Sequence, residues 1–279
     1  MLGEGGPGPL GEGTPSMIRK SLDRGPLVLS YLDNERPGPV LVGLHGHFGC
    51  ASMLSFLEEI HPGRLILIDQ RGHGFSGHPR SYERQDYLDD LDAVLTRENV
   101  VRPVILGHSL GGVNAYQYAA RTGNAQALVV EDIGTTMDLS NAWALGLADT
   151  FPTVRDAALG LAAAGVPPEP YFFESLVYDQ TAWRFRFHRE GMVESQIRMN
   201  GDHGTDWRRV GCPVLLLHGT ASWAAQTANL RQMVREVPQA ELVEFEGAGH
   251  TLHDERRPEF LAAVGAFLAR IRGTPAPLP

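Results

Sequence analysis

One serine of the chain lies in a pattern that suits nucleophilic chemistry. Ser109 is the middle residue of the segment 107–111, which has the sequence Gly-His-Ser-Leu-Gly. A short apolar run, 104–106, precedes this segment, and a helix-compatible run follows it to about residue 121. A G-x-S-x-G turn between a strand and a helix places the serine hydroxyl at the N-terminus of the helix, where the helix dipole favours negative charge. The pattern predicts that Ser109 attacks an electrophilic carbon.

A serine at its ordinary pKa is a poor nucleophile and needs a neighbouring base, which a carboxylate in turn holds in the right tautomer. His250 is the candidate base, because it follows the last predicted strand, 241–245, in a Gly-rich loop. His47 and Asp132 also lie directly after predicted strands. Ligand and catalytic sites of open α/β sheets lie at the carboxyl ends of the strands, so we expect these polar groups to meet Ser109 there.

The order of predicted elements explains how these residues are positioned. Apolar runs of strand length alternate with helix-compatible segments, which predicts a mostly parallel sheet with helices on both faces. The predicted strands are 27–32, 40–44, 64–68, 104–106, 127–130, 213–217 and 241–245. The alternation stops over residues 134–206, where aromatic, helix-like segments without a convincing strand predict an inserted helical cap. We therefore divide the chain into a core, 17–133 and 207–272, a cap, 134–206, a disordered leader, 1–16, and a disordered tail, 273–279.

The composition excludes several classes of partner. The 279 residues carry a formal net charge of −9 without a basic stripe, which argues against nucleic acid. No apolar run approaches the ~20 residues of a membrane span. The two cysteines have neither disulfide-framework nor metal-ligand spacing, which favours a reducing cytoplasm. We expect a small-molecule substrate, no metal and no cofactor, and the sequence leaves the oligomeric state open.

The chain resembles the α/β-hydrolase fold superfamily. The matching segments follow the order of that family and cover about residues 20 to 272: His-Gly at 45–46, Asp-Gln-Arg-Gly-His-Gly-Phe-Ser at 69–76, Gly-His-Ser-Leu-Gly-Gly at 107–112 and Gly-Ala-Gly-His at 247–250. The resemblance implies an oxyanion hole formed by the backbone N–H groups of Leu110 and His47.

The acid of the site departs from the usual pattern of this family. The family commonly has it in a G-x-x-D stretch after the strand at 213–217, but the segment 219–223 contains no acid, and Trp223 stands at that place. Some esterases of the family instead have the acid at the end of a different strand, the one that follows the helix after the nucleophilic serine. That position is Asp132, and the run 183–185 also resembles this small-esterase branch. Glu131 is the alternative, because neighbouring strand residues point to opposite faces.

The resemblance implies a serine hydrolase that forms an acyl-enzyme from a small ester or thioester with an apolar or aromatic part. We expect four side chains to line its pocket: Phe48, His108, Trp183 and Trp223. A C–C bond hydrolase, a lyase or a cofactor-free oxygenase on the same fold is an alternative, and so is a ligand-binding protein without activity. Dehalogenases and epoxide hydrolases are disfavoured, since their nucleophile is a carboxylate and residue 109 is serine.

Overall fold

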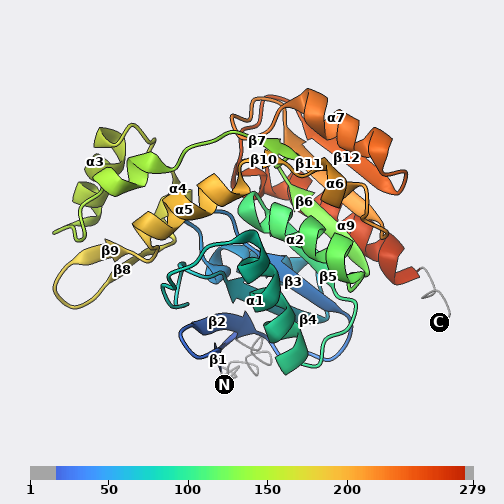
Figure 1. Ribbon diagram of the computed structural model, residues 1–279, viewed down its shortest axis with the longest axis horizontal. Helices are drawn as coiled ribbons and strands as arrows, with labels where there is room; N and C mark the ends of the chain where they lie inside the picture. Colours follow the sequence, from blue (N-terminus) through green and yellow to red (C-terminus); the bar gives the residue numbers. More distant parts are fainter. Residues whose placement is uncertain (1–16, 274–279) are drawn as a thin grey trace, which may run out of the picture.

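A computed structural model describes residues 17–273 of the chain (Figure 1). Its centre is an eight-stranded sheet. The strands lie in the order β1 (Ile18–Asp23), β2 (Val28–Asp33), β4 (Arg64–Asp69), β3 (Val40–Leu44), β5 (Val104–His108), β6 (Ala127–Glu131), β11 (Val214–Gly219) and β12 (Ala240–Phe245). From β4 to β12 neighbouring strands are parallel, whereas β1 and β2 are antiparallel to their neighbours. The predicted mostly parallel sheet is confirmed.

The central strands are buried on both faces, as their continuous apolar sequences require. Every residue of β5 and β6 is buried. Alternate residues pack into different hydrophobic clusters: Ile105 and Leu128 belong to one cluster, and Leu106 and Val129 belong to the other. Successive strand side chains point to opposite faces, so each cluster lies between the sheet and one helical layer.

Helices cover both faces, as predicted. On one face, buried residues of three core helices join the cluster of Ile105: α1 (Arg84–Arg97), α2 (Leu110–Thr122) and α7 (Thr227–Glu236). On the other face lie mainly η1 (Ala51–Glu59) and α9 (Arg257–Gly273), and the short α8 (Leu252–Glu255) precedes α9. η1 is a 3-10 helix. β1 was not predicted, because its exposed, charged sequence lacks the apolar run of a central strand.

The segment 134–206 contains helices, but the prediction that it has no strand was wrong. Its elements, together with one residue beyond it, are β7 (Thr136–Met137), η2 (Ala142–Gly146), α3 (Val154–Ala163), α4 (Pro170–Phe173), β8 (Leu176–Tyr178), β9 (Trp183–Phe185), α5 (Arg189–Met199), β10 (Gly201–Asp202) and α6 (Gly204–Trp207). Strands of two or three residues are too short to produce a recognisable alternation.

These short strands shape the segment. β7 pairs with β10, which joins the beginning and the end of the segment, and β8 pairs with β9 in a hairpin. Figure 1 shows α3 and the β8–β9 hairpin standing away from the central sheet, with α5 between them and the sheet.

The predicted disordered leader, 1–16, and the predicted tail from residue 274 lie outside the described residues, and Gly273 is the last residue of α9. Among residues 17–273, no helix has both the length and the apolar character needed to cross a membrane.

Candidate active site

Ser109 occupies a strained turn between β5 and α2. Its φ of 52° and ψ of −116° lie outside the regions that a non-glycine residue ordinarily adopts. The flanking glycines allow this turn, because a Cβ on Gly107 would lie 2.2 Å from the carbonyl oxygen of Gly111. A Cβ on Gly111 would lie equally close to the carbonyl oxygen of Leu44. The Ser109 N–H donates to the carbonyl oxygen of Glu131 at 2.9 Å, which ties the turn to the end of β6.

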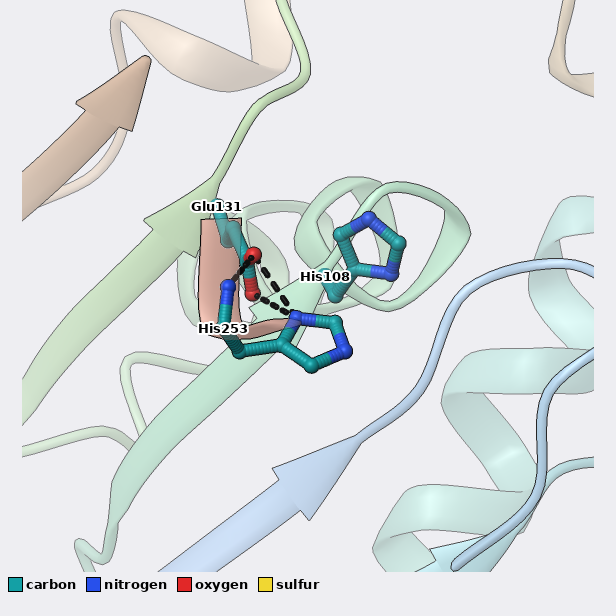
Figure 2. A group of neighbouring side chains, drawn as sticks. All are labelled: His108, Glu131 and His253. Atoms are coloured by element: carbon teal, nitrogen blue, oxygen red, sulfur yellow. Dashed lines mark hydrogen bonds and ion pairs between the residues drawn. The ribbon is translucent and has the colours of Figure 1, made fainter. Parts of the chain in front are cut away.

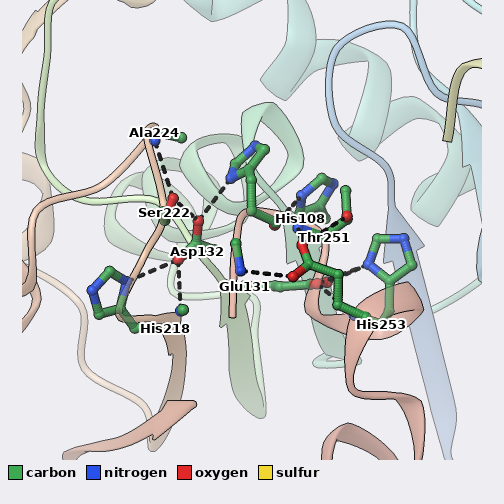
Figure 3. A network of polar contacts seen from close by, with 12 residues as sticks. His108, Glu131, Asp132, His218, Ser222, Ala224, Thr251 and His253 are labelled. Carbon is green, nitrogen blue, oxygen red and sulfur yellow. Dashed lines mark hydrogen bonds and ion pairs between the residues drawn. The ribbon is translucent and has the colours of Figure 1, made fainter. Parts of the chain in front are cut away.

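Asp132 and His250 are in direct contact. The ring Nδ1–H of His250 donates to Oδ2 of Asp132 at 2.7 Å. The other oxygen, Oδ1, accepts from the ring Nδ1–H of His218 at 2.8 Å and from the Gly219 N–H at 3.0 Å, and the Ser222 hydroxyl donates to Oδ2 (Figure 3). The carboxylate is fully buried. Burial alone would raise the pKa of Asp132, but the hydrogen bonds from His218, His250 and Ser222 outweigh it and lower the pKa.

Glu131, the alternative acid, does not face His250. Its carboxylate accepts from the backbone N–H of His253 at 3.0 Å and from the ring Nδ1–H of the same residue at 2.7 Å (Figure 2). Glu131 and Asp132 are consecutive residues at the end of β6, and their side chains meet different histidines. The structure therefore places only Asp132 against the candidate base.

His108 lies between the two histidines. Its ring centroid is 4.7 Å from that of His250 and 5.0 Å from that of His253, and its Nε2–H donates to the carbonyl oxygen of His250 at 3.1 Å. Burial and the neighbouring rings keep the pKa of His108 well below its ordinary value. The ring is therefore neutral. Through its hydrogen bond it holds the backbone of the loop that carries His250.

Of the two residues expected at the oxyanion hole, Leu110 follows Ser109 directly, and His47 lines the same cavity as Ser109. Leu110 is the first residue of α2, and the first N–H groups of a helix have no acceptor within the helix. The carbonyl oxygen of His47 accepts from the Tyr171 hydroxyl at 3.0 Å. The ring Nε2 of His47 lies 2.9 Å from Oγ of Ser195. Burial lowers the pKa of His47 to about 3, so this ring is also neutral.

Ser109 and His250 line one cavity of about 380 Å³, together with residues of the segment 134–206. Its lining residues are His47, Phe48, His108, Ser109, Leu139, Ser140, Asn141, Trp143, Gly165, Val166, Pro167, Glu169, Tyr171, Phe172, Gln196, Trp223, His250 and Thr251. None of these described residues is Lys or Arg, and Glu169 is the one carboxylate among them. Burial and the nearby Glu255 raise the pKa of Glu169.

Aromatic rings form much of the wall. Phe48 contacts Trp143 at a centroid distance of 4.6 Å and Phe172 at 5.9 Å. Trp223 is 70% exposed and lies 4.8 Å from the ring of His250. Three of the four expected pocket residues, Phe48, His108 and Trp223, line this cavity. Trp183 does not, because it belongs to β9 in the outer hairpin.

Sequence reasoning missed several residues that contact the site. His218 and Ser222 both bind Asp132, and they flank the glycine of the stretch where the family usually has its acid. A search of that stretch for any hydrogen-bond donor would have found them. Trp143 and Glu169 come from the segment 134–206, and nothing in their spacing placed them in the cavity.

Comparisons with known proteins agree with this architecture. The sequence model of the alpha/beta hydrolase family matches residues 40–264. The chain is 27% identical over 274 residues to the sn-1-specific diacylglycerol lipase ABHD11 of Mus musculus, and the match covers 90% of this chain and 88% of the lipase. It is 25% identical to a putative esterase/lipase of Haemophilus influenzae, over 82% of this chain and 83% of that protein.

Two further relatives carry other names. A putative 2-succinyl-6-hydroxy-2,4-cyclohexadiene-1-carboxylate synthase of Bacillus subtilis is 29% identical over 83% of this chain and 90% of that protein. Among solved structures, an E-2-(acetamidomethylene)succinate hydrolase has a TM-score of 0.80 at 22% identity, over 91% of this chain and all of that chain, which shows a shared fold. The family match spans most of the chain and includes both the turn at Ser109 and the loop at His250. The chain is a member of the alpha/beta hydrolase family.

Proposed function

We propose that the protein is a serine hydrolase that uses Ser109, His250 and Asp132 as a catalytic triad. The observation that carries the proposal is the 2.7 Å hydrogen bond between His250 and a buried carboxylate, at a cavity that Ser109 also lines. A histidine oriented in this way has its Nε2 available as a base for a serine hydroxyl.

The proposed reaction has two acyl-transfer steps. Oγ of Ser109 attacks the carbonyl carbon of the substrate, and Nε2 of His250 takes the hydroxyl proton. The tetrahedral intermediate then expels the leaving group, which receives that proton from His250. The product of this first step is an acyl-serine. Water attacks the acyl carbon while His250 takes a proton from it, which gives a second tetrahedral intermediate. This intermediate expels Oγ of Ser109, which receives that proton from His250, and the carboxylic acid product is released.

The negative charge of each tetrahedral intermediate needs donors in place before the reaction. We assign this role to the backbone N–H groups of Leu110 and His47, the first of which lies at the positive end of the 13-residue helix α2. A single donor of this kind contributes about 3 kcal/mol to the stability of the transition state.

The cavity supports a substrate with an uncharged acyl part. Its walls are largely aromatic and aliphatic, its two buried histidines, His47 and His108, are neutral, and the described lining residues include no Lys or Arg. A substrate carboxylate would lose its water without gaining a cationic partner, which costs several kcal/mol. Substrates with carboxylates, such as the succinate named for the structural relative, therefore fit this cavity poorly. We assign the segment 134–206 as the cap that selects the substrate.

Nitrophenyl esters of graded acyl length test the proposal. Wild type should hydrolyse short neutral esters, and Ser109→Ala and His250→Ala should each abolish turnover above background. Ser21→Ala is a matched control, because Ser21 is exposed on β1. Activity that survives Ser109→Ala but not His250→Ala would point instead to base chemistry without an acyl-enzyme, as in a lyase or a cofactor-free oxygenase. Absence of any turnover and of any covalent reaction at Ser109 would favour a binding protein.

A further inference from the structure

The end of β6 carries two acid–histidine pairs side by side. Asp132 binds His250, as described, and Glu131 binds His253, which lies three residues further along the chain, in α8. Glu131 is the last residue of β6, and Asp132 follows it with a φ of 51° in the left-handed region. The two consecutive acids reach two different histidines of one segment. The triad accounts for the first pair only.

The second pair is buried and joined to the site by direct contacts. Glu131 is 0% and His253 is 1% exposed. The ring of His108, which lies opposite Glu131 in the register of β5 and β6, packs 5.0 Å from His253 and donates to the His250 carbonyl at 3.1 Å. Figure 2 shows the Glu131 carboxylate turned toward both nitrogens that His253 presents to it, with the His108 ring beside them.

Glu131 also holds the nucleophile. Its carbonyl oxygen accepts the Ser109 N–H at 2.9 Å, while its side chain holds His253. One residue therefore fixes the backbone of the serine turn and anchors the segment that follows His250.

The contact between Glu131 and His253 favours the charged form of the histidine. Burial alone would lower the pKa of His253, but the charge and hydrogen bond of Glu131 outweigh it and raise the pKa. The charged or titratable groups that face this ring are Glu131 of β6, His108 of β5, Tyr171 of α4, Asp254 of α8 and Arg257 of α9. A buried ion pair costs desolvation energy, so its presence is weak evidence for a role in stability alone.

The same cluster consists of residue types that can also bind a metal ion. Ligand atoms of His108, Glu131 and His253 lie within 4.8 Å of one another. In this structure the Glu131 carboxylate accepts the backbone N–H and the ring Nδ1–H of His253, so it is engaged in holding that residue. The Nε2 of His253 is on the side of the ring away from Glu131 (Figure 2) and lies 3.9 Å from Oδ2 of Asp254.

We propose that Glu131 and His253 are positioning residues of the hydrolase. They hold the His250 ring in the position and orientation in which it reaches Ser109. The inference rests on the proposed function. Neither residue touches the substrate, since neither lines the cavity. A displacement of about 1 Å in a catalytic group can cost about 100-fold in rate, so loss of the anchor should appear in kcat rather than in KM.

Three variants test the role of this pair. Glu131→Gln removes the charge, and His253→Leu removes the ring donor, whereas His253→Asn places an amide N–H where Nδ1 was. Glu259→Gln on the exposed face of α9 is the matched control. Hydrolysis of a short nitrophenyl ester is measured per active site, counted by complete reaction with a fluorophosphonate, so that unfolded protein does not contribute.

We expect Glu131→Gln and His253→Leu to lower kcat per active site at least about 10-fold with KM within about twofold. His253→Asn should recover most of the loss, and the control should match wild type. If the first two variants melt at lower temperature but keep wild-type kcat per active site, the pair is structural only and the proposal is wrong. If Glu131→Gln does not fold, the comparison of His253→Leu with His253→Asn decides in the same way. A wild type that neither hydrolyses esters nor takes up the fluorophosphonate overturns the proposed function and this inference with it.

Discussion

Replacement of Asp132 by asparagine is the change whose effect on the site is most fully determined by the structure. The carboxylate accepts four hydrogen bonds, two on each oxygen. On the Oδ1 side one donor is the backbone N–H of Gly219, which cannot become an acceptor. The amide oxygen of the substituted side chain must therefore occupy the Oδ1 position, and its NH₂ group must face His250 and Ser222.

That orientation forces His250 into the wrong tautomer. Nδ1 of His250 has to accept from the new NH₂ group, which leaves the ring proton on Nε2, the atom that must take the proton of Ser109. Loss of the correct tautomer in a serine triad costs about 10⁴ in kcat. At 1.36 kcal/mol for each factor of ten, this corresponds to about 5 kcal/mol of transition-state stabilisation.

The assay is the kcat of nitrophenyl ester hydrolysis at a fixed pH near neutrality. Ser222→Ala is the informative companion, because it removes one of the two bonds to Oδ2 and leaves the tautomer of His250 intact. A single hydrogen bond to a charged group contributes about 1.5–3 kcal/mol, so this variant should lose roughly 10- to 150-fold, well short of the loss expected for Asp132→Asn. Asp89→Asn should have no effect, because Asp89 is an exposed residue of α1. Turnover of Asp132→Asn within 10-fold of wild type would refute the assignment of Asp132 as the acid.

Three further predictions concern Trp223 at the cavity, the turn around Ser109, and the pair of Glu131 and His253. Trp223→Ala should raise KM for longer acyl esters several-fold and change kcat little, because Trp223 is exposed beside His250 at the cavity; an unchanged KM across the ester series would contradict this. Gly111→Ala should abolish activity and lower the melting temperature, since its Cβ would lie 2.2 Å from a backbone oxygen of β3; an active, equally stable variant would contradict the close approach. The raised pKa of His253 means that its pairing with Glu131 stabilises the fold fully below its unfolded pKa of about 6.5 and that this contribution is lost as the pH rises through the folded value. The melting-temperature difference between wild type and Glu131→Gln should therefore shrink as the pH increases, and a constant difference would show that His253 is not charged.

The sequence predicted the sheet and the turn at Ser109 well, because the physical signals there are local and strong. The apolar runs at 104–106 and 127–130 have the length and β-branching of buried strands, and the glycines around Ser109 are required by a turn that admits no side chain. The strands of the segment 134–206 were missed because two or three residues carry no periodicity.

The contacts of the candidate site were less predictable. Whether Glu131 or Asp132 faces His250 depends on a one-residue register that the sequence does not determine. The roles of His218 and His253 depend on long-range packing, since each binds an acid more than 80 positions away. Trp183 was expected in the pocket, but it belongs to the β8–β9 hairpin and does not line the cavity.

The central claim is that Ser109 is a nucleophile activated by His250, and intact-mass analysis after reaction with a fluorophosphonate tests it most directly. The account predicts one equivalent of label on wild type, located at Ser109, none on Ser109→Ala, and much slower labelling of His250→Ala. A wild-type protein that stays unlabelled, or a Ser109→Ala variant that is labelled as fast as wild type, would contradict it.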